Sequence, residues 1–184
     1  MRVVVFDLDG TLIAGNSFHQ WLFTFSGWLL KQGRLLGCLH LLFWIGARAV
    51  RYISHLELKR QVIALSVASR LPQNMINAFV DRLVAAARPE LLQKIAEHKK
   101  DGARVAIATA AFDLYLPGFA EHCGADDLIA TSSHLSPNWQ ENLKARKLQS
   151  IQEYYGKDVV IDAVYSDHSD DLPLFRQAKR AIVV

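Results

Sequence analysis

Five short apolar runs, separated by stretches with helical spacing, limit the fold more than any other feature of this chain. The first run, residues 3–6, contains only β-branched and aromatic side chains, which is typical of a strand covered on both faces. In the second half of the chain, such runs alternate with helical stretches. This alternation predicts an α/β fold, with a Rossmann-like parallel sheet and helices on both of its faces. The other predicted strands are residues 104–109, 127–131, 159–165 and 181–184.

Residues 14–87 interrupt this alternation, because they contain no convincing strand and consist of consecutive apolar helical stretches. We interpret them as an all-helical cap inserted after the first strand, which leaves residues 1–13 and 88–184 for the core. Pro89 and Gly102 mark the start and the stop of the first core helix. Further core helices are predicted at residues 112–122, 143–155 and 171–178.

The composition is that of a globular domain. Of 184 residues, 51% are hydrophobic and 21% are charged, and the formal net charge is +3. That excess is too small and too dispersed to indicate a nucleic-acid partner. Cys38 and Cys123 lie far apart without metal-ligand spacing, which points to a reducing cytoplasm. The apolar run at the N-terminus is too short for a signal peptide, so we expect a cytoplasmic protein.

Two acidic motifs follow predicted strands. In FDLDGTL, Asp7 and Asp9 lie two residues apart at a strand end, and Gly10 allows a sharp bend. In YSDHSDDLPLF, Asp167 follows a later strand, whereas helix capping alone can explain Asp170 or Asp171. If the two strands are adjacent and parallel, three carboxylates (Asp7, Asp9 and Asp167) meet and form an open Mg²⁺ site. A solvated turn is the alternative explanation for the first motif alone.

A phosphate bound at such a site needs donors and positive charge. The Thr109 hydroxyl and the Ala110 N–H are predicted to point into the same crevice. Lys144, at the start of a predicted helix, is our choice for the phosphate-binding cation. Arg146 and Lys147 compete with it, and a solvated basic helix face would also explain all three.

FDLDGTL, a Thr at a strand end, a Lys and then SDxxxD, in this order, resemble the haloacid dehalogenase superfamily. The similarity is to its phosphoserine phosphatase-like branch (subfamily IB), which has a helical cap after the first motif. The resemblance implies that Asp7 is the nucleophile and Asp9 the general acid/base. It also implies Mg²⁺ held by the Asp7 carboxylate, the Asp9 main-chain carbonyl and Asp167. Thr109 and Lys144 would bind phosphate, and Gly10, Thr11, Asp170 and Asp171 would support the site.

Two residues depart from the family pattern, and the second of them bears on the substrate. Ser166 stands where a Gly is usual, and Asn16 stands where phosphoserine phosphatases have a substrate-reading Glu. A neutral amide would not pair with the ammonium group of phosphoserine, so we do not expect that substrate. The remaining candidates for contact with the substrate are cap residues: Asn16, His19, His55, Lys59 and Arg60.

We therefore expect an Mg²⁺-dependent phosphomonoester hydrolase that acts through an aspartyl phosphate on Asp7. A phosphotransferase or mutase would use the same residues. A receiver-type phosphoacceptor domain would need an acceptor Asp after the middle strand. Here the predicted middle strand, residues 127–131, ends at Thr131 and is followed by Ser132. Receiver domains also lack a helical insertion after the first strand. A non-enzymatic binding protein with a relic site is disfavoured by the retention of all the motif residues.

The apolar cap has two interpretations. It either buries its aromatic residues on itself and on the core, or exposes part of them as an interfacial hairpin at the inner face of the membrane. Lys31, Arg34, Arg48 and Arg51 lie near the ends of the apolar runs. The second interpretation resembles bacterial phosphatidylglycerophosphate phosphatases of the same branch, whose cap is likewise apolar. We therefore expect the partner to be a phosphorylated small molecule or, as this resemblance implies, a lipid phosphate of the phosphatidylglycerophosphate kind. The oligomeric state is left open.

Overall fold

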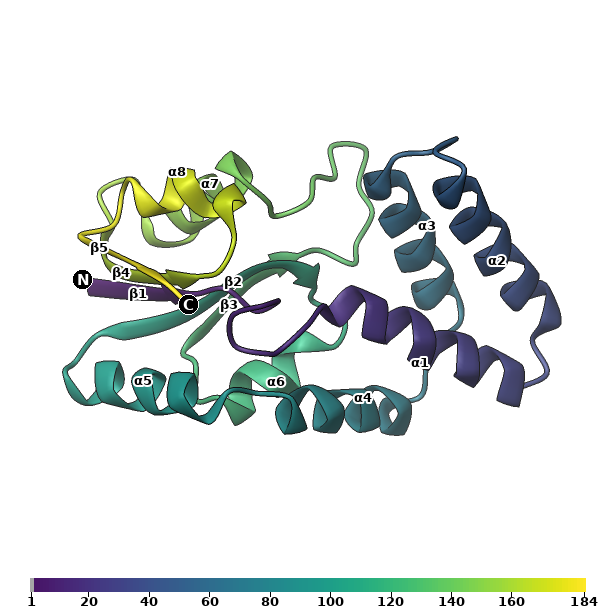
Figure 1. Cartoon of the computed structure of the whole chain (residues 1–184), viewed down its shortest axis with the longest axis horizontal. Coiled ribbons are helices and arrows are strands. Elements are labelled where there is room, and N and C mark those ends of the chain that lie inside the picture. The colour runs from purple at the N-terminus through teal and green to yellow at the C-terminus, as the bar shows by residue number, and fades with distance from the viewer. Residues whose placement is uncertain (1) are drawn as a thin grey trace.

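The structure, a computed structural model, describes residues 2–184 and contains a parallel five-stranded sheet (Figure 1). The strand order is β3-β2-β1-β4-β5, so the first strand lies at the centre. The predicted α/β fold is thereby confirmed. The strands are β1 (Arg2–Phe6), β2 (Arg104–Phe112), β3 (Asp127–Thr131), β4 (Val160–Ser166) and β5 (Arg180–Val183).

Two details of the sheet differ from the prediction. β2 does not end at Thr109 but continues to Phe112, with a register shift against β3 between Ala108 and Phe112. The following helix, α6 (Leu116–His122), therefore starts later than predicted. β3 is third in the chain but lies at an edge of the sheet rather than in the middle, because the chain crosses back over β1 to form β4.

Helices cover both faces of the sheet (Figure 1). Along β1, Val4 and Phe6 face one hydrophobic core, whereas Val3 and Val5 face a second one, as alternation in a doubly covered strand requires. The first face is covered by α5 (Pro89–Lys100) and α6, and the second by α7 (Ala145–Tyr155) and α8 (Leu172–Phe175). The helix predicted over residues 171–178 is thus limited to a 3₁₀ turn, η1 (Ser169–Asp171), and the short α8.

The segment between β1 and α5 is entirely helical. It contains α1 (Ser17–Lys31), α2 (Leu35–Ala49), α3 (His55–Ala68) and α4 (Gln73–Ala85). The chain enters and leaves it through adjacent backbones, since Ile13 bridges Ala87 and the Arg88 N–H donates to the Leu12 carbonyl at 2.8 Å. This pairing supports, as a proposal, the division between core and cap at residues 13/14 and 87/88. Met1 of the predicted core lies outside the described residues.

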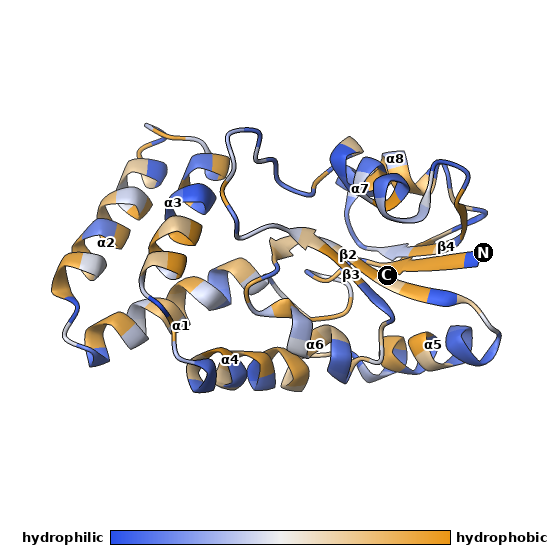
Figure 2. Cartoon of the chain, turned by 180° about the vertical axis from the view of Figure 1, so that it is seen from behind, coloured by the Kyte–Doolittle hydropathy of each residue, from blue (hydrophilic) through white to orange (hydrophobic). Residues whose placement is uncertain are grey.

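The cap is joined to the core by a buried aromatic cluster. Trp21 on α1 packs edge-on against Phe79 on α4, with ring centroids 5.1 Å apart, and lies at the same distance from Tyr115. All three side chains are fully buried. α2 lies at the far end of the cap from the sheet and packs on α1 and α3 (Figure 2). Among residues 2–184, none of the helices has both the length and the apolar character that a membrane crossing requires.

Candidate active site

A pocket of about 570 Å³ opens at the carboxyl edge of the sheet, where the loops after β1 and β4 approach the cap. Ligands of doubly wound sheets bind at this edge. Most residues predicted for the site line this pocket, and Thr11 contacts one of them. The pocket-lining residues among those predicted are Asp7, Asp9, Gly10, Asn16, His55, Lys59, Thr109, Ala110, Asp167, Asp170 and Asp171.

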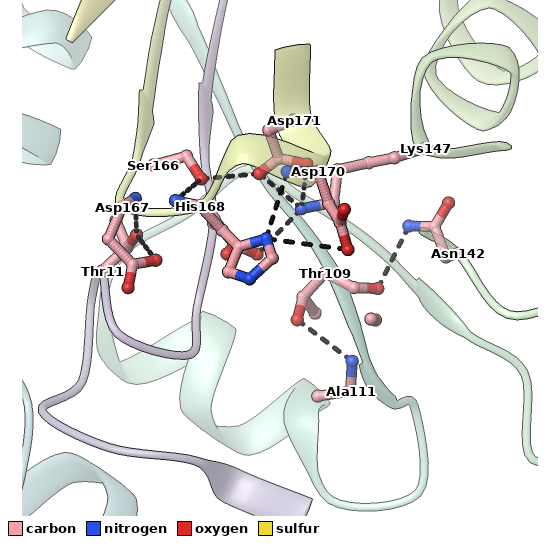
Figure 3. Close-up of polar contacts among 12 residues, drawn as sticks. Thr11, Thr109, Ala111, Asn142, Lys147, Ser166, Asp167, His168, Asp170 and Asp171 are labelled. Carbon is pink, nitrogen blue, oxygen red and sulfur yellow. Dashed lines mark hydrogen bonds and ion pairs between the residues drawn. The ribbon is translucent and has the colours of Figure 1, made fainter. Parts of the chain in front are cut away.

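Lys147 lies between two carboxylates of this pocket (Figure 3). Its Nζ is 3.0 Å from Asp7 Oδ1 and 2.7 Å from Asp171 Oδ1, and its side chain is only 3% exposed. Burial disfavours the charged ammonium, but the two carboxylates outweigh burial and raise the pKa of Lys147. Burial raises the pKa of Asp7 to about 6, although Lys147 acts in the opposite direction. Asp7 is therefore held in place by an ion pair in a largely dehydrated setting.

Lys144, which was predicted to be the phosphate-binding lysine, does not lie in the pocket, so this prediction is wrong. Its side chain is 65% exposed, does not line the pocket, and comes no closer than 3.8 Å to the carboxylate of Asp170. Lys144 precedes the first turn of α7 with a positive φ of 56°, whereas Lys147 lies within the helix on its buried face. The three-residue step from 144 to 147 is almost one helical turn, so sequence spacing alone could not separate the two.

Asp9 is engaged with the cap. Its Oδ1 accepts a hydrogen bond of 2.7 Å from the backbone N–H of Ser17, the first residue of α1. Burial raises the pKa of Asp9, while the Ser17 hydrogen bond works against this shift. A carboxyl group with a raised pKa retains its proton closer to neutral pH, which suits a general acid.

Gly10 and Thr11 position Asp167. The Thr11 Oγ1 accepts the backbone N–H of Asp167 at 3.0 Å and lies 3.3 Å from its Oδ1 (Figure 3). Gly10 has a φ of +77°, and a Cβ placed there would lie 2.0 Å from Asp167 Oδ2. Only glycine therefore allows both the turn after β1 and the close approach of the Asp167 carboxylate.

The predicted cluster of three carboxylates does not form. Among residues 2–184 there is no group of three or more His, Cys, Asp or Glu side chains arranged to hold a metal ion. The reason is that Asp9 turns its carboxylate to α1, so Asp7 and Asp167 are the carboxylates left for a cation. Carboxylate and main-chain carbonyl oxygens are the ligands that Mg²⁺ prefers, and it keeps several waters in such sites. The carboxylates of Asp7 and Asp167, which line the same pocket, are ligands of a type that fits Mg²⁺.

Thr109 and Ala110 line the pocket from the irregular part of β2. The buried Thr109 hydroxyl accepts the N–H of Ala111 at 3.1 Å, and the Ala110 carbonyl accepts the hydroxyl of Thr131 at 2.9 Å. Asn142 fastens the loop after β3 to this region by donating to the carbonyl of Thr109 at 3.1 Å. The bulge in β2, rather than a strand end, therefore presents these groups to the pocket.

Ser166, which departs from the family pattern, fits the site well. Its Oγ donates to Asp171 Oδ2 at 2.7 Å and accepts the backbone N–H of His168 at 3.2 Å. It thus fixes the carboxylate that also pairs with Lys147.

Asp170 lines the pocket, and its backbone N–H donates to His168 Nδ1 at 3.1 Å.

The predicted substrate residues of the cap divide into two groups. Asn16, His55 and Lys59 line the pocket, although Asn16 also caps α1 by accepting the N–H of His19 at 3.0 Å. His19 and Arg60 do not line it, and the Arg60 guanidinium instead lies 5.8 Å from the ring centroid of Trp139.

Sequence reasoning missed Glu141, which lines the pocket and pairs with Lys59. It also missed Asn142, which anchors the loop that carries Glu141. Both residues lie in an irregular segment between β3 and α7, where no periodicity or motif marks them.

The fold and the site together define a hydrolase of the haloacid dehalogenase type. The family model described as haloacid dehalogenase-like hydrolase matches residues 4–176, which is nearly the whole chain. The chain therefore belongs to the haloacid dehalogenase-like hydrolase family, as the motifs predicted.

The chain is also similar to individual proteins along most of its length. Protein CicA of Caulobacter vibrioides (strain NA1000 / CB15N) is 28% identical over 178 residues, which cover 92% of this chain and 79% of CicA. A Bordetella pertussis Tohama I protein of unknown function has a similar structure, with a TM-score of 0.74 and 17% identity over 99% of this chain and 89% of its own. The structure of a phosphoserine phosphohydrolase-like protein of Francisella tularensis subsp. tularensis SCHU S4 is similar with a TM-score of 0.60 and 16% identity. The match covers 100% of this chain and 87% of that protein. At these identities the two structures show a shared fold.

Two glycines with nearly equal φ test the packing of Asp167. Gly10 (φ +77°) lies against the Asp167 carboxylate, whereas a Cβ at Gly102 (φ +73°) would meet no atom within 4 Å. We expect Gly102→Ala to lower the free energy of unfolding by about 1 kcal/mol through backbone strain alone. Gly10→Ala should lower the free energy of unfolding by roughly 2 kcal/mol more than Gly102→Ala does, because its methyl group displaces Asp167. Urea unfolding measures both, and equal losses would show that Asp167 does not depend on this contact.

Proposed function

We propose that the protein is an Mg²⁺-dependent phosphomonoesterase that forms an aspartyl phosphate on Asp7. The observation that carries this proposal is the buried pair of Asp7 and Lys147 in a pocket shared with Asp167 and Thr109. A carboxylate in this setting can attack phosphorus, while the ammonium offsets the charge on the phosphoryl oxygens. The name of the Francisella tularensis relative supports a phosphate ester as the substrate.

The reaction takes two steps. An Asp7 carboxylate oxygen bonds to phosphorus, the bond from phosphorus to the ester oxygen breaks, and Asp9 gives its proton to that oxygen. Water then attacks the phosphorus of the aspartyl phosphate, Asp9 takes a proton from this water, and the bond from phosphorus to Asp7 breaks. The raised pKa of Asp9 favours its first role, and its hydrogen bond from Ser17 orients it for both.

Mg²⁺ would be held by Asp7, Asp167 and the Asp9 carbonyl, and when bound it would neutralise charge on the phosphoryl group. It would also favour the ionised form of Asp7, whose pKa burial raises in the metal-free protein. Asn16, His55 and Lys59 line the side of the pocket formed by the cap. The cap therefore offers the leaving group the Asn16 amide and the Lys59 ammonium, whose charge is paired with Glu141 of the core.

The nucleophile is tested by the hydrolysis of p-nitrophenyl phosphate. We expect Mg²⁺-dependent release of phosphate that EDTA removes and that Asp7→Asn abolishes, because an amide cannot form the phosphoenzyme. Asp9→Asn is the matched isosteric change, and it should lower turnover by about 10²-fold or more while Mg²⁺ affinity falls less. Activity that survives EDTA, or Asp7→Asn at most of the wild-type rate, would remove the assignment.

The two lysines provide a matched pair. Lys147→Gln should lower kcat/KM by about 10²-fold or more, because the phosphoryl oxygens and Asp7 lose their common cation. Lys144→Gln should change kcat/KM by less than about twofold, since that ammonium lies outside the pocket. Circular dichroism of each variant checks the fold. Similar losses in both variants would argue against Lys147 as the phosphate-binding lysine.

A lipid phosphate is the second candidate substrate, with the protein bound peripherally at the cytoplasmic face of the membrane. The observation in its favour is an exposed apolar face on α2, where Leu36 is 83% exposed and Phe43 is 63% exposed. Leu35, Leu39 and Leu42 extend this face, which we call the α2 face. The sequence between Asp9 and Glu57 contains no acidic residue. An apolar helix face without neighbouring carboxylates suits the surface of an anionic bilayer.

Sedimentation with vesicles tests this candidate. At physiological salt, we expect the protein to sediment with vesicles that contain phosphatidylglycerol, and Leu39→Ser/Phe43→Ser to remain in the supernatant. Val67→Ser/Val183→Ser is the control, because it removes exposed valines from other elements. If the wild-type protein stays wholly in the supernatant, the lipid phosphate is excluded and a soluble phosphate ester is the candidate substrate that remains.

A further inference from the structure

A second pocket lies among α1, α2 and α3, three of the four helices of the cap. Its volume is about 850 Å³, which is within the range of small-molecule sites. The side chains around it are mostly apolar: Phe18, Leu22, Phe23, Leu42, Ile45 and Leu58. We call it the cap pocket. The chemistry proposed above, which takes place at the sheet edge, makes no use of it.

The cap pocket adjoins the active site. His55 lines both pockets, and the neighbouring residues Leu58 and Lys59 on α3 line the cap pocket and the active site respectively. The Phe18 ring, which lines the cap pocket, packs edge-on against His55 with centroids 5.6 Å apart. It also lies 5.6 Å from the Lys59 ammonium. The two pockets are thus separated by little more than the first turns of α1 and α3.

The polar groups of the cap pocket are neutral or basic. Arg48 and Arg51 line it together with His19, Ser26 and His55, and its lining includes no carboxylate. A substrate part with an ammonium group would find no partner here. A hydrocarbon chain would match the apolar walls, and the basic groups nearby would favour a substrate with an anionic head over one with a cationic head.

We infer that the cap pocket binds the hydrocarbon part of an amphiphilic phosphomonoester whose phosphate occupies the active site. This inference rests on the proposed function and names its substrate class: a single alkyl or acyl chain that bears a phosphate. The arrangement gives the cap a definite task, since binding energy gained on the chain holds the phosphate against Asp7. The cap pocket would hold the hydrocarbon chain itself, whereas the α2 face, which shares Leu42 with this pocket, concerns contact with a membrane surface.

Binding of alkylphosphonates tests the cap pocket without requiring catalysis, because their carbon–phosphorus bond is not hydrolysed. Calorimetry with Mg²⁺ present compares methylphosphonate and octylphosphonate below the concentration at which the latter aggregates. We expect octylphosphonate to bind at least about 100-fold more tightly, which corresponds to the burial of three or four methylene groups.

Two variants fill the cap pocket from different helices: Ala49→Trp from α2 and Ser26→Phe from α1. Each should reduce the preference for octylphosphonate at least tenfold and leave methylphosphonate binding unchanged. Leu39→Trp is the control, because it puts the same indole on an exposed position of α2 outside the pocket. Circular dichroism shows which variants keep the fold, and the second variant serves if the first does not.

The outcomes separate this inference from the proposed function. Equal affinity of the wild type for both phosphonates, or an unchanged preference in both filled variants, would overturn the cap pocket assignment. Chain-length-dependent binding that the filled variants lose would support it even if no phosphate ester is hydrolysed. The absence of hydrolysis would overturn only the proposed phosphatase activity and not the assignment of the cap pocket.

Discussion

The buried ion pairs of Lys147 are the interaction on which the site depends. An ammonium and two carboxylates are removed from water here, and such groups are tolerated only when each is paired. The pairing joins the end of β1, which carries Asp7, to α7 and to the turn after β4, which carries Asp171. Without the cation, two carboxylates would face each other in a poorly hydrated setting. One lysine thus stabilises the meeting of three segments and sets the charge around the nucleophile.

The position of the cap is linked to the same edge of the sheet. Ser17 donates the first free N–H of α1 to Asp9, so the residue that we propose as the general acid is oriented by the start of the cap. Lys59 on α3 pairs with Glu141 of the core across the pocket. Any movement of the cap that breaks these contacts would also change the surroundings of Asp9. Cap and chemistry are therefore coupled through two polar contacts rather than through the apolar interface alone.

Short-range signals allowed much of the site to be predicted. Asp7 directly follows the apolar run 3–6, and Asp167 comes two residues after the predicted strand 159–165, so the places of both at strand ends could be read directly. Lys147 could not be distinguished from Lys144, because both lie in one basic segment and only the packing of α7 turns one inward. The cluster of three carboxylates failed for a similar reason, since Asp9 finds a closer donor at the start of the cap.

The sequence alone determined the fold class, the helical character of the segment after the first strand and the positions of the acidic residues of the two motifs, because these depend on local periodicity and on neighbours in the chain. The tertiary structure decided which lysine enters the site, how β2 presents Thr109 through a bulge, and that Glu141 reaches the pocket. It also decided which apolar side chains of the cap are covered and which enclose the cap pocket. These outcomes depend on how helices rotate and pack against distant segments, and hydrophobic spacing within a single helix does not contain that information.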